Sequence, residues 1–344
     1  MDAINITPDF RILPDETIFN QFSKETDKWE SFVKGDDFSS ITLAYSQFAK
    51  SADKEILRKI IDYIKKDQNI ITLPADFLGI IEIILDIFNE EFKWRDDVEV
   101  NLKERSQKRF KKDYTSLHIS ADNGSIIGME YLMKNIYSRI KHKWITIGDP
   151  DNIPLIKKER YIIGPKKGEL SIGNLRSVSN QIKIKAKKLH FIYCGIIGNS
   201  TEVVIYILYS IILARKKTSV ICKLPDRMSS SILSAIHMFS MCFEHIYIKN
   251  TYIGAYLIGR NFIEEIINKK TSDNIYKYLT SIINNPDIIF PIYKNFDFVT
   301  MNNFIKTLKT KLNIKKDIVL SQEHYMNIIS PINNFPKNLS KCIN

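Results

Sequence analysis

The chain has 344 residues, of which 44% are hydrophobic and 26% charged, and it contains 19 Phe and 16 Tyr. This is enough apolar material for a large core, and it excludes a wholly disordered protein. The formal net charge of +11 favours an anionic partner, above all nucleic acid, although a biased coding sequence could equally account for the excess of lysine.

The cysteines and the apolar runs define the environment that we expect. Cys194, Cys222, Cys242 and Cys342 form no CxxC pair, and three of them lie in apolar runs, so we expect reduced cysteines, no metal site and a cytoplasmic protein. The N-terminus lacks the apolar segment of a signal peptide. The longest apolar run, residues 203–214, is too short for a membrane span, which takes about 20 residues.

Residues 1–112 are expected to form a helical N-terminal region. Apolar residues recur at helical spacing in residues 15–33 and 53–66. Residues 74–92, "PADFLGIIEIILDIFNEEF", begin with proline in the first turn and carry apolar side chains on most faces of the helix. This last helix is therefore expected to be buried.

In residues 113–265, short β-branched runs alternate with helical stretches. This pattern predicts an α/β domain with a doubly wound, mostly parallel sheet. The last two strands are only four residues apart, which indicates an antiparallel pair and one reversed strand in the sheet. Strands are expected at residues 115–120, 143–148, 160–165, 188–195, 218–225, 245–250 and 255–262. Helices are expected at residues 125–141, 174–182, 200–216 and 229–243. Residues 266–344 read as a helical C-terminal extension followed by a tail.

A fold of this class binds ligands beyond the carboxyl ends of its strands. The first strand is followed by "SADNGS", residues 120–125, a small turn that would let the backbone approach a ligand, or would simply join a strand to a helix. Lys223 ends the strand "SVICK", where such folds place functional groups. The alternative is a lysine that extends from the sheet edge into water.

The order of these pieces resembles the FtsJ-type (RrmJ-like) ribose 2′-O-methyltransferase family, especially its branch that methylates mRNA caps in eukaryotes and large DNA viruses. The resemblance covers residues 100–265 and depends on order and spacing more than on any one motif. It is carried by "SADNGSIIGMEYLM", "GPKKGELSIGNLRSVSNQI", "ICKLPDRMSSSILSAIHMFSMCFEHIYIKN" and "TYIGAYLIGRNF".

The resemblance implies a Rossmann-like S-adenosylmethionine fold and a catalytic tetrad of Lys, Asp, Lys and Glu. The central lysine corresponds to Lys223 and the first to Lys108, with Lys103 or Lys112 as alternatives. In such a site, carboxylates would hold a lysine that orients the ribose hydroxyl and stabilises its developing charge. The cofactor-binding positions that the resemblance implies are Ser120, Ala121, Asp122, Asn123, Gly124 and Asp149.

The acidic members of that tetrad are missing from this chain. Cys194 stands where the family has the aspartate, and Gly254 stands where it has the glutamate. In the cofactor turn, Asp122 and Asn123 replace the expected proline and glycine, and an aspartate there would repel the carboxylate of the cofactor. Glu202 and Asp226 are the nearby acids that could substitute.

Basic residues cluster in three places, at residues 103–112, 183–188 and 215–217. The first cluster leads into the first strand, near the expected RNA cleft, and the other two precede the amino ends of strands. Each cluster could also be an ordinary solvated surface. The RNA-binding candidates are Lys103, Arg105, Arg109, Lys111 and Lys112.

Three hypotheses follow from the sequence. The first is a non-catalytic, FtsJ-like subunit that supports an active protein partner in an RNA-capping or RNA-methylation complex. The chain resembles the small subunit of poxvirus mRNA-capping enzymes in this respect, in architecture only and not motif by motif. The second is an active cap 2′-O-methyltransferase with displaced carboxylates, which would need S-adenosylmethionine and capped RNA. The third is a structural or interaction protein that inherited the fold.

Overall fold

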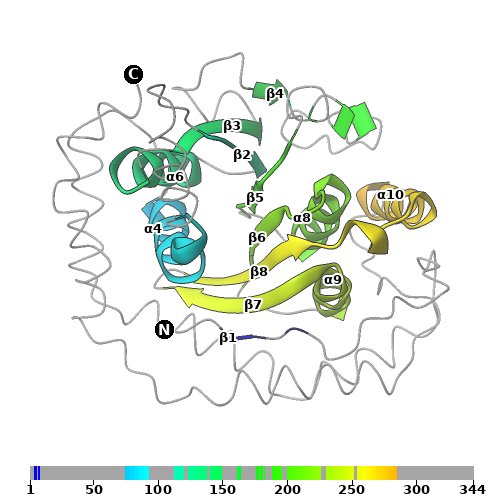
Figure 1. Ribbon diagram of the computed structural model, residues 1–344. Helices are drawn as coiled ribbons and strands as arrows, with labels where there is room; N and C mark the ends of the chain where they lie inside the picture. Colours follow the sequence, from blue (N-terminus) through cyan, green and yellow to red (C-terminus); the bar gives the residue numbers. More distant parts are fainter. Residues whose placement is uncertain are drawn as a thin grey trace.

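The computed structural model describes residues 4–5, 7, 74–92, 112–119, 123–137, 140–148, 161–163, 188–195, 200–225, 230–251 and 254–284, with five residues between 176 and 182. Within these ranges the fold is α/β, with one mixed sheet covered by helices on both faces (Figure 1). The expected α/β class is therefore confirmed. No helix in these ranges has the length and apolar character needed to cross a bilayer.

The sheet contains eight strands among the described residues, in the spatial order β1-β7-β8-β6-β5-β2-β3-β4. Strands β4, β3, β2, β5 and β6 are parallel, and β8 is antiparallel to both β6 and β7, as the short connection between the last two strands predicts. The strands are β1 (Ile4–Asn5), β2 (Lys112–Ile119), β3 (Ile140–Gly148), β4 (Tyr161–Ile163), β5 (Phe191–Cys194), β6 (Ser219–Lys223), β7 (Phe243–Thr251) and β8 (Gly254–Phe262).

Two layers of helices enclose the sheet. Helices α4 and α6 cover one face, and α8 and α9 cover the other, with α10 packed outside α8 (Figure 1). The helices are α4 (Pro74–Ile83), α6 (Asn123–Asn135), α8 (Ser200–Leu213), α9 (Ser230–Met241) and α10 (Lys269–Asn284). A π-helical turn, η1 (Ile84–Phe88), extends α4, and a short 3₁₀ helix, η4 (Glu264–Ile266), precedes α10.

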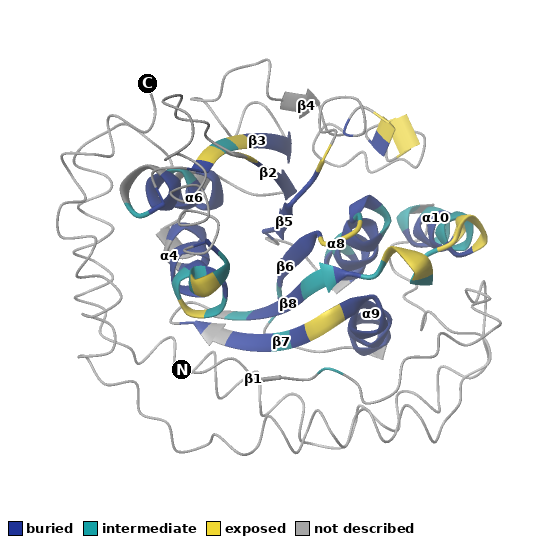
Figure 2. Cartoon of the chain, in the orientation of Figure 1, coloured by how far each residue is buried: buried dark blue, intermediate teal, exposed yellow. Residues whose placement is uncertain are grey.

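The central strands are buried on both faces, which is why they read as continuous apolar runs. In β5, Ile192 and Cys194 belong to the core beneath α8, whereas Phe191 and Tyr193 belong to the core beneath α4 and α6. The same alternation holds along β6. Figure 2 shows this buried centre in dark blue, whereas exposed residues of the described ranges, in yellow, occur on β7, on outer helix faces and in turns.

The N-terminal part of the chain contributes directly to the sheet domain. The expected buried helix at residues 74–92 is confirmed, and it packs on α6 and on the sheet. A methyl group added to Gly128 of α6 would lie 2.4 Å from Ile80 of α4, so the two helices approach too closely for a larger residue. Strand β1 pairs with β7, so the expectation that residues 1–112 are wholly helical is wrong at Ile4–Asn5.

Candidate functional site at Lys223

Lys223 is the last residue of β6, at the carboxyl edge of the parallel strands. Side chains alternate along a strand, so Lys223 points to the opposite face from Cys222, which belongs to the core beneath α8. The Lys223 side chain is 20% exposed, and its Nζ atom donates to Oδ1 of Asp76 over 3.1 Å. The lysine therefore forms a largely buried ion pair and does not extend freely into water.

Asp76 is the carboxylate that sequence analysis missed. It lies in the first turn of α4, 147 residues before Lys223, and its side chain is only 1% exposed. The available signal was one acid in the first turn of a helix whose other faces are mostly apolar. Asp76 was overlooked because residues 1–112 were treated as separate from the sheet.

Lys223 contacts one carboxylate among the described residues, whereas the tetrad would supply two. Among the described residues, Asp76 is the only acid within ion-pair distance of the lysine. Of the two acids proposed as substitutes, Glu202 lies on α8 and forms no such pair with it, and Asp226 lies outside the described residues. The Oδ2 atom of Asp76 is buried and has no hydrogen-bond partner in the same ranges.

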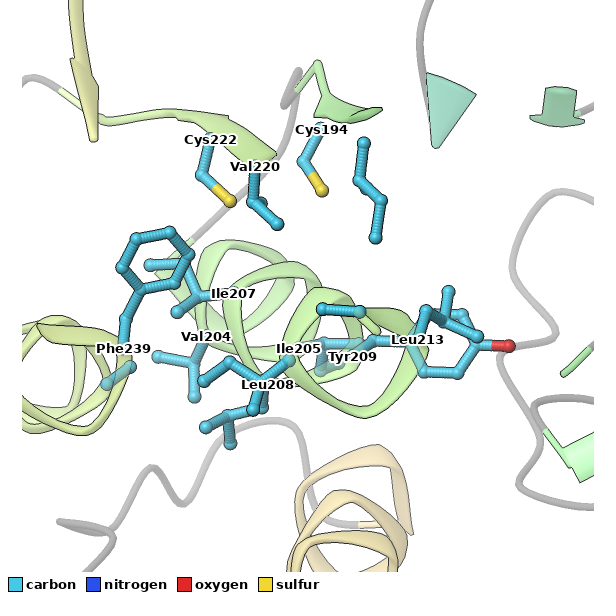
Figure 3. Close-up of a cluster of buried hydrophobic side chains, with 14 of the residues drawn as sticks. Cys194, Val204, Ile205, Ile207, Leu208, Tyr209, Leu213, Val220, Cys222 and Phe239 are labelled. Carbon is cyan, nitrogen blue, oxygen red and sulfur yellow. The ribbon is translucent and has the colours of Figure 1, made fainter. Parts of the chain in front are cut away.

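Cys194 faces away from Lys223. Its thiol points toward α8, beside that of Cys222, as Figure 3 shows, and its Sγ atom lies 3.8 Å from the carbonyl oxygen of Tyr206. Burial, and then the neighbouring Cys222 thiol, raise the pKa of Cys194 well above its ordinary value. The residue therefore remains a neutral thiol and cannot replace a carboxylate.

Gly254 adds no functional group to the site. It is the first residue of β8, paired with Thr251 across the hairpin. The residue that faces Lys223 across the β6–β8 ladder is instead Tyr256, which is fully buried. A methyl group added to Gly79 of α4 would lie 2.4 Å from the Tyr256 hydroxyl, so the helix lies directly against the sheet beside the lysine.

Two further cations of the sheet pair with acids of the same N-terminal helical stretch. Lys249 of β7 is 1% exposed and contacts Asp86 and, at 3.8 Å, Glu82. Arg260 of β8 lies 3.5 Å from Glu91. Together with Lys223 on β6, these pairs attach residues 74–92 to three neighbouring strands. Attachment of this helix is thus a structural role that Lys223 shares with Lys249 and Arg260.

The expected cofactor turn is described only in part. Asn123 and Gly124 open α6 at the carboxyl edge of the sheet, where a ligand-binding turn was expected, and Gly124 is buried. The other predicted cofactor positions, Ser120, Ala121, Asp122 and Asp149, lie outside the described residues. The same holds for Lys103, Arg105, Lys108, Arg109 and Lys111, and the backbone of Lys112 begins β2.

Comparison of the chain with models of known protein families and with curated proteins finds no match. Within the described ranges, no group of three or more His, Cys, Asp or Glu side chains is arranged to hold a metal ion.

Proposed function

We propose that this protein is a non-catalytic relative of the FtsJ-type RNA 2′-O-methyltransferases that acts as a supporting subunit in an RNA-capping or RNA-methylation complex. The observation that carries the proposal is the pairing of Lys223 with one buried aspartate of α4. In the tetrad that the resemblance implies, two carboxylates would hold the central lysine. Here a thiol on the other face of the sheet and a glycine stand at their positions.

The sheet topology supports the relationship on which this proposal depends. The resemblance implies parallel strands and one reversed strand near the end of the domain. Among the described residues, five strands pair in parallel, and β8 is reversed between β6 and β7. Lys223 lies at the carboxyl edge of this sheet, where doubly wound folds bind ligands.

One observation favours a second candidate, an active methyltransferase with a displaced carboxylate. Asp76 could hold the Lys223 ammonium in place of the missing acids, since their atoms are 3.1 Å apart. In that case Asp76 would act by positioning the lysine, and the lysine would contact the ribose hydroxyl. We favour the non-catalytic function because Lys249 and Arg260 form similar pairs with the same helical stretch.

Calorimetric titration with S-adenosylmethionine and capped RNA, each with and without the other, tests the proposal. We expect no cofactor binding that depends on Asp76 or Lys223, and we expect a methyltransferase or guanylyltransferase to co-purify with the protein from its native source. Asp76→Asn, which keeps the shape of the side chain, is the informative variant. Cofactor-dependent binding of capped RNA that Asp76→Asn abolishes would favour the second candidate instead.

A further inference from the structure

A cluster of positive charge lies at the amino ends of the parallel strands. Strands β3, β2, β5 and β6 are parallel neighbours, so their amino ends meet at one edge of the sheet, opposite the edge that holds Lys223. Six cations lie at this edge, of which five are exposed and Arg215 is half-buried. We call this set the amino-end patch: Lys141 and Lys143 of β3, Lys188 before β5, and Arg215, Lys216 and Lys217 before β6.

Two of the basic loops are fixed side by side by the hydroxyl group of Thr218. Its Oγ1 atom donates to the carbonyl oxygen of Leu189 over 2.7 Å and accepts from the backbone N–H of Arg215 over 3.0 Å. Leu189 directly follows Lys188, and Thr218 directly follows Lys217. The lysines before β5 and before β6 are therefore presented from neighbouring loops whose backbones the fold already orders, which lowers the entropic cost of binding a ligand there.

Most members of the amino-end patch have no counter-charge within the part of the chain that the structure describes. Lys143 pairs with Asp113, and both side chains are about half-exposed. None of the other five cations lies within ion-pair distance of a described acid. The exposed acids Glu244, Glu264 and Glu265 belong to β7 and η4, on the antiparallel side of the sheet. The patch is therefore a region of one charge sign that these acids border.

The size and chemistry of the amino-end patch fit the backbone of a nucleic acid. Its members extend over four neighbouring strands, or about 14 Å at the usual spacing between strands. Several phosphates fit within this length, because each strand of a duplex carries one about every 3.4 Å. The ammonium group of lysine binds a phosphate as a point charge and does not distinguish one base from another.

The side chains beside the patch do not favour base stacking or insertion into a lipid bilayer. Tyr114 and Trp144, at the amino ends of β2 and β3, are buried, so their rings are not available for a base to stack on. Binding to a membrane through a basic surface also uses apolar side chains that enter the lipid. The apolar neighbours of the basic loops, Leu189 and Ala214, are buried. Contact with a phosphate backbone is the binding mode that these surroundings support.

We propose that the amino-end patch binds the phosphate backbone of RNA, on the opposite edge of the sheet from Lys223. The inference deepens the proposed function and rests on it for the choice of RNA. Strand β6 runs from Ser219, beside the patch, to Lys223, a length of about 13 Å. A nucleotide bound at the patch therefore does not lie at the lysine. The subunit would hold RNA for its partner while the carboxyl edge of its own sheet stays uncovered.

The test is fluorescence anisotropy of a labelled, uncapped, single-stranded RNA with the full-length protein over a series of salt concentrations. Lys188→Gln/Lys216→Gln should weaken binding at low salt and reduce the slope of log K against log salt by about 1.4, because each phosphate contact on a single strand contributes about 0.7. Lys270→Gln/Lys277→Gln removes the same charge from α10 and is the matched control, whose slope should equal that of wild type. All four lysines are exposed, so both variants should keep the fold.

Three results would overturn the inference. They are a wild-type protein that binds no RNA at low salt, an unchanged slope for Lys188→Gln/Lys216→Gln, and an equal reduction of the slope in both double variants. Wild-type protein that binds phosphatidylserine vesicles but no RNA would assign the patch to a membrane instead. The RNA has no cap and no cofactor is added. Patch-dependent binding by a protein that co-purifies with no capping partner would therefore retain this inference and contradict the proposed function.

Discussion

At the scale of single residues, Lys223 and Asp76 have unequal access to solvent, and this makes the consequences of removing either one unequal. The lysine is 20% exposed and can turn its ammonium toward water, whereas the aspartate, at 1%, cannot. An isolated charge is strongly destabilising only where water cannot reach it. The two single substitutions are therefore predicted to differ, although they break the same ion pair.

Lys223→Met should lower the free energy of unfolding by about 3 to 5 kcal/mol, because it leaves the Asp76 carboxylate buried without its cation. Asp76→Asn should cost only about 1 kcal/mol. The double variant Lys223→Met/Asp76→Leu should recover most of the loss. Urea denaturation measures all three, and equal costs for the two single variants would show that the asymmetry in burial has no energetic consequence.

Lys249 provides a second test of the buried charges. It is fully enclosed between β7 and the helical stretch, and Glu82 beside it is 3% exposed. Lys249→Ala should cost about 3 to 5 kcal/mol. Lys143→Ala is the control, because its pair with Asp113 is roughly half-exposed on both sides and should contribute under about 1 kcal/mol. If both substitutions lowered the free energy of unfolding by the same amount, burial of Lys249 would not explain its contribution to stability.

His237 makes the stability depend on pH. Burial lowers the pKa of His237 from 6.5 to about 4, so the folded protein holds this ring neutral while the unfolded chain protonates it. The contribution of His237 to the free energy of unfolding is therefore fully present above pH 6.5. It is lost as the pH falls toward 4 and amounts to about 3 kcal/mol. Denaturant titrations at several pH values between 7 and 4.5 give the free energy of unfolding as a function of pH. This free energy should fall less steeply with decreasing pH for His237→Leu than for wild type. An unchanged slope would exclude His237 as the cause.

At the scale of elements, the contact between α4 and α6 determines how the N-terminal stretch sits on the sheet. Gly128 allows the two helices to meet, because any larger residue there would collide with Ile80 and with the backbone of Phe77. Gly128→Ala should destabilise the fold by about 1 to 3 kcal/mol despite the higher helix propensity of alanine. A thermal melt measures the change, and a stabilised Gly128→Ala variant would contradict the close packing.

The elements themselves were well predicted where local pattern decides them. The helix at residues 74–92 and the hairpin of β7 and β8 follow from apolar periodicity and from a short connection. The pairing of Asp76 with Lys223 could not be predicted, because it joins residues 147 apart in sequence and depends on which face of the sheet α4 covers. Strand β1 was missed because two residues are too few to show alternation.

At the scale of the whole molecule, both helical layers are part of one folded unit with the sheet. The core beneath α4 and α6 includes side chains from β2, β5, β6 and β8, so residues 74–92 could not be removed without exposing it. A truncation that begins at residue 112 should therefore be insoluble or lack cooperative unfolding, as judged by circular dichroism and a thermal melt. A soluble, cooperatively folded fragment would show that the helical stretch is a separable addition.

The central claim is the proposal that Lys223, which pairs among the described residues with the single carboxylate of Asp76, does not support methyl transfer. The most direct test is a single-turnover assay with tritiated S-adenosylmethionine, with the protein in excess over capped RNA, comparing wild type with the Lys223→Met/Asp76→Leu double variant. We predict that neither protein transfers label to the RNA above background. Transfer by the wild type that the double variant loses would contradict the claim.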